Sequence, residues 1–428
     1  MSDVIQGSAR RRVVLTGIAS AGTALISAPR VLARPAAAIV IVGGGFAGAT
    51  CARELRRQSE RLAITLVEPN PRFTAGPASN EVIAGLRRIE AQQFGYDALK
   101  RDGITVVQQD AIAVDPRAHI VRLRDGSIHR YARLVLAPGI DLRYGAIPGY
   151  GTAAVDLMPH AWKAGPQTQL LRRQLEAMDD GGLVVISVPA NPFRCPPAPY
   201  ERASLIAHFL KTRKPRSKLI ILDAKDSFVQ QRLFQAAWQD LYPGLLEWVP
   251  LSAGGAVSDV DPAGQIIRTD RHSYRASVAN LIPPQKAGTI ARLAGVADRT
   301  GWCPIDPVSF ESRLQPDIHV IGDAAIAGAM PKSAFAASSQ AKVCAAAIAS
   351  LVRGLPPADH RLFNTSYSLV APDYGISIAS VYRPSNGQLA EVADIGGTSP
   401  LNAPRSLRVE EARHAASWFR TVTSVVFG

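Results

Sequence analysis

The chain of 428 residues is 47% hydrophobic and 19% charged, and its formal net charge at pH 7 is +13. This balance is typical of a folded protein of two or three domains and excludes an intrinsically disordered chain. The positive charge favours an acidic protein partner or an anionic substrate, whereas the lack of a basic-aromatic motif argues against nucleic-acid binding.

The first 33 residues differ in composition from the rest of the chain. The arginines Arg10 to Arg12 precede a weakly hydrophobic run rich in Ala, Gly and Ser, which ends in Val31-Leu32-Ala33. This arrangement is typical of a twin-arginine signal peptide, so we expect export to the periplasm as a folded protein. The alternative is an amphipathic or disordered tail. Elsewhere no run of eighteen apolar residues lacks a charge, so we expect no transmembrane segment in the mature chain.

A dinucleotide-binding signature follows directly. An apolar β-branched run at 38–42 leads into a GxGxxG turn with Gly43, Gly45 and Gly48, and then into a helical segment. The glycines permit a tight turn and let backbone N–H groups at the helix N-terminus approach a pyrophosphate. The next apolar strand ends in Glu68, at the spacing of an acid that binds a ribose hydroxyl.

Two later segments favour FAD as the dinucleotide. The strand in "YARLVLAPGI" ends at Gly139, where large flavoproteins return to the FAD domain. The strand in "PDIHVIGDAA" ends in Asp323, whose carboxylate holds the ribityl chain in such folds. We expect the following helix to point its N-terminus at the flavin ring, with Lys332 adding positive charge beside the reduced ring.

A second strand–loop–helix unit has no glycine turn. A strand at 181–188 and a helix at 201–211 are joined by "PANPFRCPPAPY", which contains five prolines and no glycine. Proline fixes φ and removes N–H donors, so this loop cannot cradle a pyrophosphate as a glycine turn does. We expect a domain that has lost nicotinamide binding, with Cys195 in the space so freed and Glu201 six residues later.

The remaining cysteines give little direct chemistry. Cys51, Cys303 and Cys344 form no CxxC motif or Cys/His cluster with Cys195, which argues against a metal site or covalent haem. Cys51 and Cys344 lie in Ala-rich helical segments and are expected to be small core residues. Cys303 is the only alternative partner that we consider for a disulfide with Cys195.

Several long segments carry a family resemblance from residue 38 to the C-terminus, among them "SNEVIAG", "PHAWKAGPQTQLLRRQLEAM", "PFRCPPAPYERAS", "NLIPPQKAG", "GWCPID", "MPKSAF" and "APDYGIS". The chain resembles the flavoprotein subunit of flavocytochrome c sulfide dehydrogenase. The resemblance implies a periplasmic FAD protein that oxidises sulfide and passes electrons to a c-type cytochrome subunit. It places Cys195 beside the flavin, Glu201 near that site, and Trp418 in the family's C-terminal tail. It also implies FAD contacts for the residues Gly43, Gly45, Gly48, Glu68 and Asp323.

Two positions depart from the family's pattern. Gly76 stands where the resemblance implies the cysteine that bonds the flavin covalently, and Ser366 stands where it implies a second redox cysteine. A serine hydroxyl cannot form a disulfide and does not ionise readily. We therefore expect non-covalent FAD and no two-cysteine relay.

Three functional readings stay open. In the first, Cys195 alone carries a thiolate or persulfide beside FAD, with its pKa lowered by Arg194 or by a field from the flavin side and with Glu201 moving protons. Alternatively, Glu201 is simply a carboxylate at a helix start. In the second reading, the flavoprotein has changed its substrate or resembles a sulfide:quinone oxidoreductase. In the third, it is a non-catalytic flavin-binding partner of a cytochrome.

These landmarks predict an α/β fold with two Rossmann-like three-layer ββα domains, of the glutathione-reductase type, plus a C-terminal α+β interface domain. The FAD-binding domain spans 34–150 and 285–350, and the nicotinamide-like domain spans 151–284. The interface domain spans 351–428, with strands in "LVAPDYGISIASVYRP" and a helix in "LRVEEARHAASWFRTVTSVV".

Overall fold

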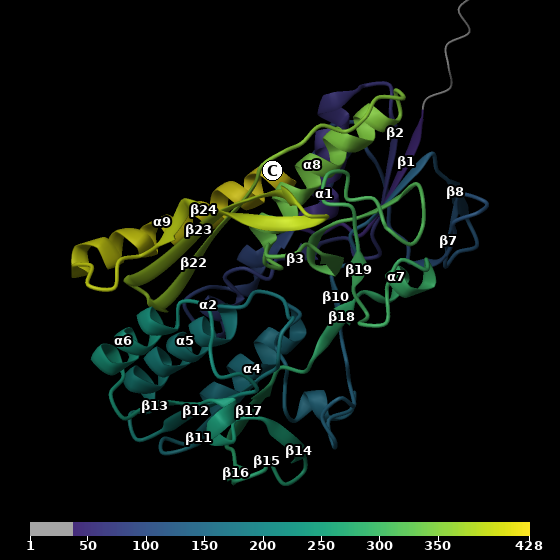
Figure 1. Cartoon of the computed structure of the whole chain (residues 1–428). Coiled ribbons are helices and arrows are strands. Elements are labelled where there is room, and N and C mark those ends of the chain that lie inside the picture. The colour runs from purple at the N-terminus through teal and green to yellow at the C-terminus, as the bar shows by residue number, and fades with distance from the viewer. Residues whose placement is uncertain (1–36) are drawn as a thin grey trace, which may run out of the picture. The chain divides into compact units, whose positions relative to one another are not determined.

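The computed structural model of the chain describes residues 37–428, so the expected signal segment at 1–33 lies outside the described residues (Figure 1). The β-branched run at the start forms strand β1 (Ala38–Val42), the centre of a five-stranded parallel sheet ordered β20-β9-β1-β2-β5. The other four strands are β2 (Ala63–Val67), β5 (Thr105–Val107), β9 (Arg133–Leu136) and β20 (Ile318–Val320).

Helices and a second sheet complete this first Rossmann-like unit. Helix α1 (Phe46–Gln58) packs against α8 (Ala334–Leu351), whose sequence is rich in alanine. An antiparallel sheet contacts β1 through its last strand and consists of β6 (Ala111–Asp115), β7 (Ile120–Leu123) and β8 (Ile128–Arg130). Short elements between β2 and β5 are β3 (Phe73–Thr74), α2 (Ser79–Ile83), β4 (Gln93–Phe94) and α3 (Asp97–Arg101).

The second Rossmann-like unit is built on a four-stranded parallel sheet ordered β13-β12-β11-β17. Its strands are β11 (Leu183–Val188), β12 (Lys218–Asp223), β13 (Leu246–Val249) and β17 (Val278–Leu281), and its helices are α4 (Pro166–Ala177), α5 (Ala198–Arg213) and α6 (Gln231–Leu241). A three-stranded antiparallel sheet accompanies it, formed by β14 (Val257–Asp261), β15 (Ile266–Thr269) and β16 (Ser273–Arg275). The chain enters and leaves this unit through the antiparallel pair β10 (Ile140–Leu142) and β18 (Gln285–Ala287).

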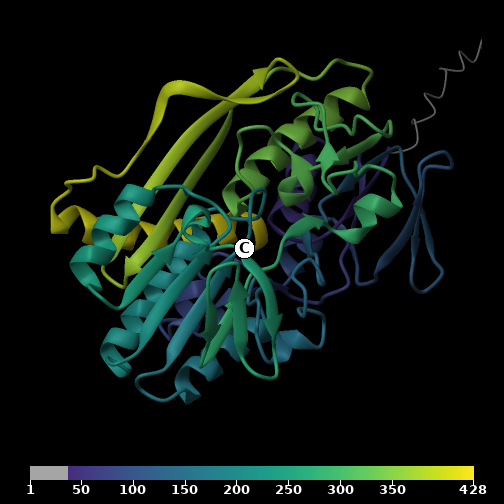
Figure 2. The same ribbon diagram turned by 60° about the horizontal axis from the view of Figure 1, so that its bottom comes forward.

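The C-terminal part is an antiparallel sheet of β22 (Leu362–Ala371), β23 (Tyr374–Ser385) and β24 (Gln388–Thr398), followed by α9 (Arg405–Phe427). Strand β22 contacts α8 of the first unit and α5 and α6 of the second, so this sheet joins the two Rossmann-like units (Figure 2). The remaining short elements are α7 (Thr289–Leu293), β19 (Cys303–Pro304) and β21 (Ala325–Ile326). The expected α/β fold class is confirmed.

Two local differences from the sequence prediction have simple causes. Helix α5 begins at Ala198, three residues earlier than expected, because prolines are well tolerated in the first turn of a helix. Strand β24 was not expected, because its segment contains Asp394 and two glycines and has no run of β-branched residues. Within the described residues, α8 alone has the length and hydropathy of a membrane-spanning helix, and 61% of it is buried inside the protein.

Candidate active site

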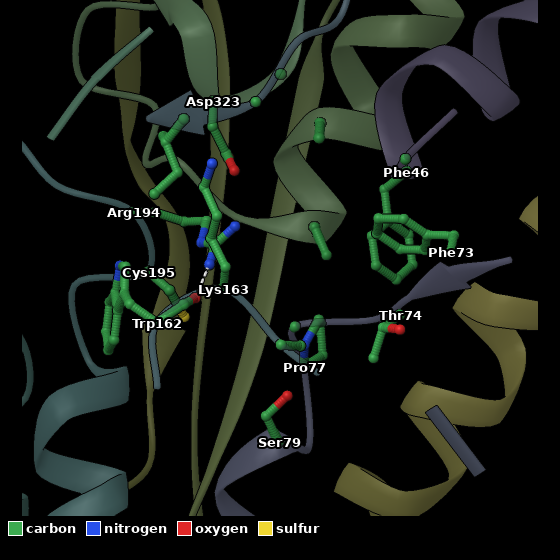
Figure 3. A pocket seen from close by; sticks show the side chains of 18 of the residues that line it. Phe46, Phe73, Thr74, Pro77, Ser79, Trp162, Lys163, Arg194, Cys195 and Asp323 are labelled. Atoms are coloured by element: carbon green, nitrogen blue, oxygen red, sulfur yellow. Dashed lines mark hydrogen bonds between the residues drawn. The ribbon is translucent and has the colours of Figure 1, made fainter. Parts of the chain in front are cut away.

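One cavity of about 540 Å³ brings together the glycine turn, the loop before α5 and the segment between β20 and α8. We call it the central pocket. Figure 3 shows Cys195, Arg194 and Trp162 on one side of it and Phe46 and Phe73 on the opposite side. Most of the residues that the sequence singled out line this pocket, namely Gly43, Gly45, Glu68, Gly139, Cys195, Glu201 and Asp323. Gly48 and Lys332 are not among its lining residues.

The glycine turn between β1 and α1 has a backbone that side chains would obstruct. Gly43 has φ +103°, and a Cβ there would lie 2.3 Å from the carbonyl oxygen of Ala137. A Cβ on Gly48 would lie 1.8 Å from the carbonyl oxygen of Gly43, so Gly48 allows the helix to approach the strand and does not face the pocket. Helix α1 begins without a side-chain cap, which leaves its first N–H groups available to a phosphate at the pocket wall.

Two carboxylates stand at places suited to the rest of a bound FAD. Glu68 accepts hydrogen bonds from the backbone N–H of Gly44 at 2.8 Å and from both nitrogens of Asn70, which hold it beside the glycine turn. Asp323 follows β20, and within residues 37–428 its side chain makes no hydrogen bond or ion pair. An uncapped helix terminus, a glycine turn and an unpaired carboxylate on one pocket wall fit the phosphates and ribityl chain of FAD. The roles of both carboxylates toward the cofactor remain predictions.

Cys195 is held by its backbone. Its φ is +56°, a left-handed conformation that is strained for a residue with a side chain. Its N–H donates to the carbonyl oxygen of Lys332 at 2.7 Å, and its own carbonyl accepts from the N–H of Ala198 at 2.9 Å. These bonds tie the loop to both α5 and the segment before α8. The half-buried thiol therefore has a fixed place on the pocket wall.

The expected lowering of the thiol pKa is wrong for the protein alone. Burial raises the pKa of Cys195 from 9.0 to about 12, the negative charge of Glu201 adds to this, and Arg194 only partly opposes it. Arg194 donates a hydrogen bond from its guanidinium to the carbonyl oxygen of Trp162, and its N–H donates to Gln285 at 2.9 Å. Its cation therefore does not pair directly with the sulfur, and Cys195 is a thiol at neutral pH.

Glu201 occupies the first turn of α5 and has both carboxylate oxygens hydrogen-bonded. Oε2 accepts from Asn80 Nδ2 at 2.7 Å, and Oε1 accepts from the backbone N–H of Leu369 at 2.9 Å. Burial raises the pKa of Glu201 from 4.5 to about 7, whereas these two donors lower it. The carboxyl group is thus close to half-ionised at neutral pH, which suits a group that exchanges protons.

Lys332 is not among the residues that line the central pocket, and its expected role beside the flavin stays a prediction. Its Nζ donates to the carbonyl oxygens of Asp323 at 2.8 Å and Ala325 at 2.7 Å, and it lies 4.0 Å from the ring centroid of Trp302. The ammonium group is therefore turned away from the pocket and toward backbone acceptors. Because the carbonyl of Lys332 also accepts from Cys195, this residue ties the Cys195 loop to the Asp323 turn.

In the second Rossmann-like unit, the acid at the end of the second strand is hydrogen-bonded by neighbouring side chains. Asp223, at the end of β12, is 0% exposed and accepts hydrogen bonds from Tyr200 at 2.6 Å, from Trp248 at 3.0 Å and from Lys225. An acid at the end of the second strand is the group that holds the ribose of a nicotinamide dinucleotide. Here its oxygens are already occupied, and the preceding loop has no glycine turn. Both facts support the prediction that nicotinamide does not bind.

The other cysteines lie apart from the pocket. All four cysteines are free thiols, and Cys51, Cys303 and Cys344 are 0% exposed.

Ser366 lies on β22, on the same strand face as Asn364. Asn364 Oδ1 accepts a hydrogen bond at 2.7 Å from Ser333, which lines the pocket. Among residues 37–428 no group of three His, Cys, Asp or Glu side chains is placed to hold a metal ion.

Sequence reasoning missed three polar residues of the pocket, which are Asn80, Lys163 and Arg202. Asn80 and Lys163 belong to the segments "SNEVIAG" and "PHAWKAG", but nothing in a single sequence distinguishes them from other polar loop residues. Arg202 gave a signal that could have been used. It is 3% exposed and precedes the apolar run Leu205 to Ala207 of α5, and a charge in such a place needs partners.

Three family models match successive parts of the chain. Residues 37–179 match pyridine nucleotide-disulphide oxidoreductase, residues 168–283 match the central part of the sulfide dehydrogenase [flavocytochrome c] flavoprotein chain, and residues 358–427 match the flavin-binding part of flavocytochrome c sulphide dehydrogenase. The flavoprotein chain of sulfide dehydrogenase from Chlorobaculum thiosulfatiphilum is 48% identical over 44 residues, which are 10% of this chain and 92% of that sequence.

More distant relatives share larger parts of the chain. Mitochondrial sulfide:quinone oxidoreductase from Mus musculus is 22% identical over 307 residues, which are 67% of this chain and 65% of that protein, slightly less than two thirds of its length. The solved structure of sulfide:quinone oxidoreductase from Aquifex aeolicus has a TM-score of 0.71 at 18% identity, over 91% of this chain and 92% of that one, which shows a shared fold. The three family models and the match to the Chlorobaculum thiosulfatiphilum sequence show that the chain belongs to the flavoprotein chains of flavocytochrome c sulfide dehydrogenase, among the FAD-dependent pyridine nucleotide-disulfide oxidoreductases.

Proposed function

We propose that the protein is an exported FAD-dependent oxidoreductase that oxidises sulfide, or a related small sulfur compound, with Cys195 as its only reactive thiol. The observation that carries this proposal is the position of Cys195 and Glu201 on the wall of the pocket that also contains the glycine turn and Asp323. The pocket residue Arg194, whose guanidinium binds the carbonyl oxygen of Trp162, gives the pocket positive charge, which favours entry of the HS⁻ anion.

The reaction needs a two-electron acceptor and a proton acceptor. Bound FAD supplies the acceptor for two electrons and one proton. When HS⁻ and the Cys195 thiol join in a persulfide anion, R–S–S⁻, two electrons and two protons are released, and the carboxylate of Glu201 takes the proton that the cofactor would not take. Glu201 suits this task because its pKa is raised to about 7, so it is partly ionised before the reaction and stable when protonated. A second HS⁻ can then bond to the outer sulfur and leave with it as hydrogen disulfide, HS–S⁻, while the Cys195 thiolate takes the proton back from Glu201.

The proposal includes FAD held without a covalent bond. Gly76 lines the pocket, and glycine has no side chain that could bond the flavin. Hydrogen bonds from the glycine turn and the carboxylates Glu68 and Asp323 would hold the cofactor instead.

The electrons are proposed to leave to a c-type cytochrome, because the family is named for a complex with one and because the nucleotide place at Asp223 is filled by protein groups. The relatives named as sulfide:quinone oxidoreductases make a quinone the alternative acceptor. A non-catalytic flavin-binding partner of a cytochrome remains the third reading.

Anaerobic mixing of the FAD-loaded protein with sulfide tests the proposal. Sulfide should bleach the flavin absorbance of the native protein, and Cys195→Ala should retain FAD but lose this bleaching. Cys303→Ala is the matched control, because Cys303 is a buried thiol outside the pocket and its removal should leave the bleaching rate unchanged. Equal rates in the native protein and Cys195→Ala would show that the thiol takes no part.

A further inference from the structure

Asn80 joins three elements at one point of the central pocket. This residue is 6% exposed and lies in α2, where its Nδ2 donates to Glu201 Oε2 at 2.7 Å and to the carbonyl oxygen of Ala198 at 3.1 Å. Its Oδ1 accepts from Arg202 Nε at 3.0 Å. One amide therefore connects α2 to two neighbouring residues of α5 that have opposite charges.

The orientation of this amide is determined by Arg202. A guanidinium group only donates hydrogen bonds, so the Asn80 oxygen must face Arg202 and the Asn80 nitrogen must face Glu201. Arg202 itself is fixed, because it also donates to the carbonyl oxygens of His160 at 3.1 Å and Ala161 at 2.6 Å and to Asn280 Oδ1 at 2.9 Å. Asn80 thus cannot rotate to offer its oxygen to a protonated Glu201.

We propose that Asn80 is a positioning residue for sulfide oxidation, which presents the Glu201 carboxylate to the pocket in its proton-accepting state through an amide that Arg202 orients. This inference rests on the proposed function of Glu201 as proton acceptor. The backbone N–H of Leu369 holds the other carboxylate oxygen from β22, so the two donors together fix the carboxylate plane. Deletion of the Asn80 donor leaves the Glu201 carboxylate plane unfixed and removes one of the two hydrogen bonds that stabilise the ionised carboxylate.

The charged groups around Glu201 come from three places. Glu81 of α2 opposes ionisation of Glu201, whereas Arg202 on α5 favours it. The thiol of Cys195 lies in the loop before α5 and is itself affected by the charge of Glu201. From β22, the Glu201 carboxylate accepts a hydrogen bond from the backbone N–H of Leu369. Removal of Asn80 leaves all of these groups in place, so its effect can be isolated.

The test compares Asn80→Ala with Asn280→Ala in the full FAD-loaded protein. Both asparagines are buried and both bond Arg202, but only Asn80 contacts Glu201. Two quantities are measured from pH 5.5 to 9.5 (about two units on either side of neutrality): the rate of anaerobic flavin bleaching by sulfide, and the carboxylic-acid C=O band of Glu201 in the infrared spectrum. Glu201→Gln identifies this band by its loss.

We expect the midpoint of both titrations to rise by about 1 to 2 pH units in Asn80→Ala, because a hydrogen bond to an ionised group contributes free energy of this size. Asn280→Ala should leave the midpoint at its native value. Asn80→Asp retains the shape of the side chain and its contact with Arg202 but loses the donor, so it should also raise the midpoint, and it carries the test if Asn80→Ala does not fold.

An unchanged midpoint in both Asn80 variants, or an equal rise in Asn280→Ala, would overturn the proposal. The two readouts also separate it from the proposed function. If sulfide fails to bleach the native flavin while the infrared midpoint still rises in the Asn80 variants, the positioning of Glu201 stands and sulfide is the wrong substrate.

Discussion

Alkylation of Cys195 provides a direct measure of the environment of its thiol. Because burial raises the pKa of this thiol from 9.0 to about 12, the thiolate fraction below pH 9 falls about 1000-fold relative to an ordinary cysteine. A thiolate of higher pKa is intrinsically more nucleophilic, which returns a factor of about 15 to 30. The net expectation at pH 8 is that iodoacetamide modifies Cys195 about 30 to 60 times more slowly than a free cysteine.

The assay follows modification of the Cys195 peptide by mass spectrometry from about pH 7 to about pH 10, a range that ends about two units below the raised pKa of the thiol. The rate should rise about tenfold per pH unit without levelling, because the folded-state pKa lies above this range. Glu201→Gln should increase the rate, because the negative charge of Glu201 raises the thiol pKa, and Arg194→Met should decrease it. Cys303 is 0% exposed and is the internal control for unfolding. A rate that levels off below pH 9, or one equal to that of free cysteine at pH 8, would refute the reasoning.

Two further predictions concern the cofactor and the second Rossmann-like unit. Gly76→Cys places a thiol on the pocket wall, where a Cβ would have no atom within 4 Å. Part of the FAD should then become covalently attached and stay with the acid-precipitated protein. The native protein should release all of its flavin under the same treatment. Asp223→Ala removes the acceptor of three buried donors and leaves Lys225 without its partner, so it should destabilise the unit by about 3 to 5 kcal/mol. Denaturant unfolding followed by Trp248 fluorescence measures this loss, and an unchanged midpoint would contradict the role of Asp223.

The parts of the fold that could be predicted from sequence are those that local patterns encode. Strand β1 and the glycine turn follow from a β-branched run and from the spacing of Gly43, Gly45 and Gly48, because both depend on residues adjacent in the chain. Strand β24 is stabilised by pairing with β23 rather than by its own composition, so its segment carried no signal.

The candidate site was predicted in part for the same reason. Asp323 directly follows a strand, and Cys195 lies in a proline-rich loop between a strand and a helix. Their place on the pocket wall could therefore be predicted from the order of these elements along the chain. The direction of the Lys332 side chain depends on the carbonyl groups of Asp323 and Ala325, and the pKa of Cys195 depends on burial by distant segments. Neither is a property of the local sequence, and the predicted lowering of the thiol pKa by Arg194 was wrong for this reason.

Strand β22 does more than join two units. It provides the Leu369 N–H that holds Glu201, and its Asn364 bonds Ser333 at the start of α8. Strand β22 therefore holds residues of the central pocket in place, although no residue beyond Ala337 lines this pocket. Exchange of β22 between related flavoproteins should therefore alter proton transfer at Glu201 without changing any residue that lines the pocket.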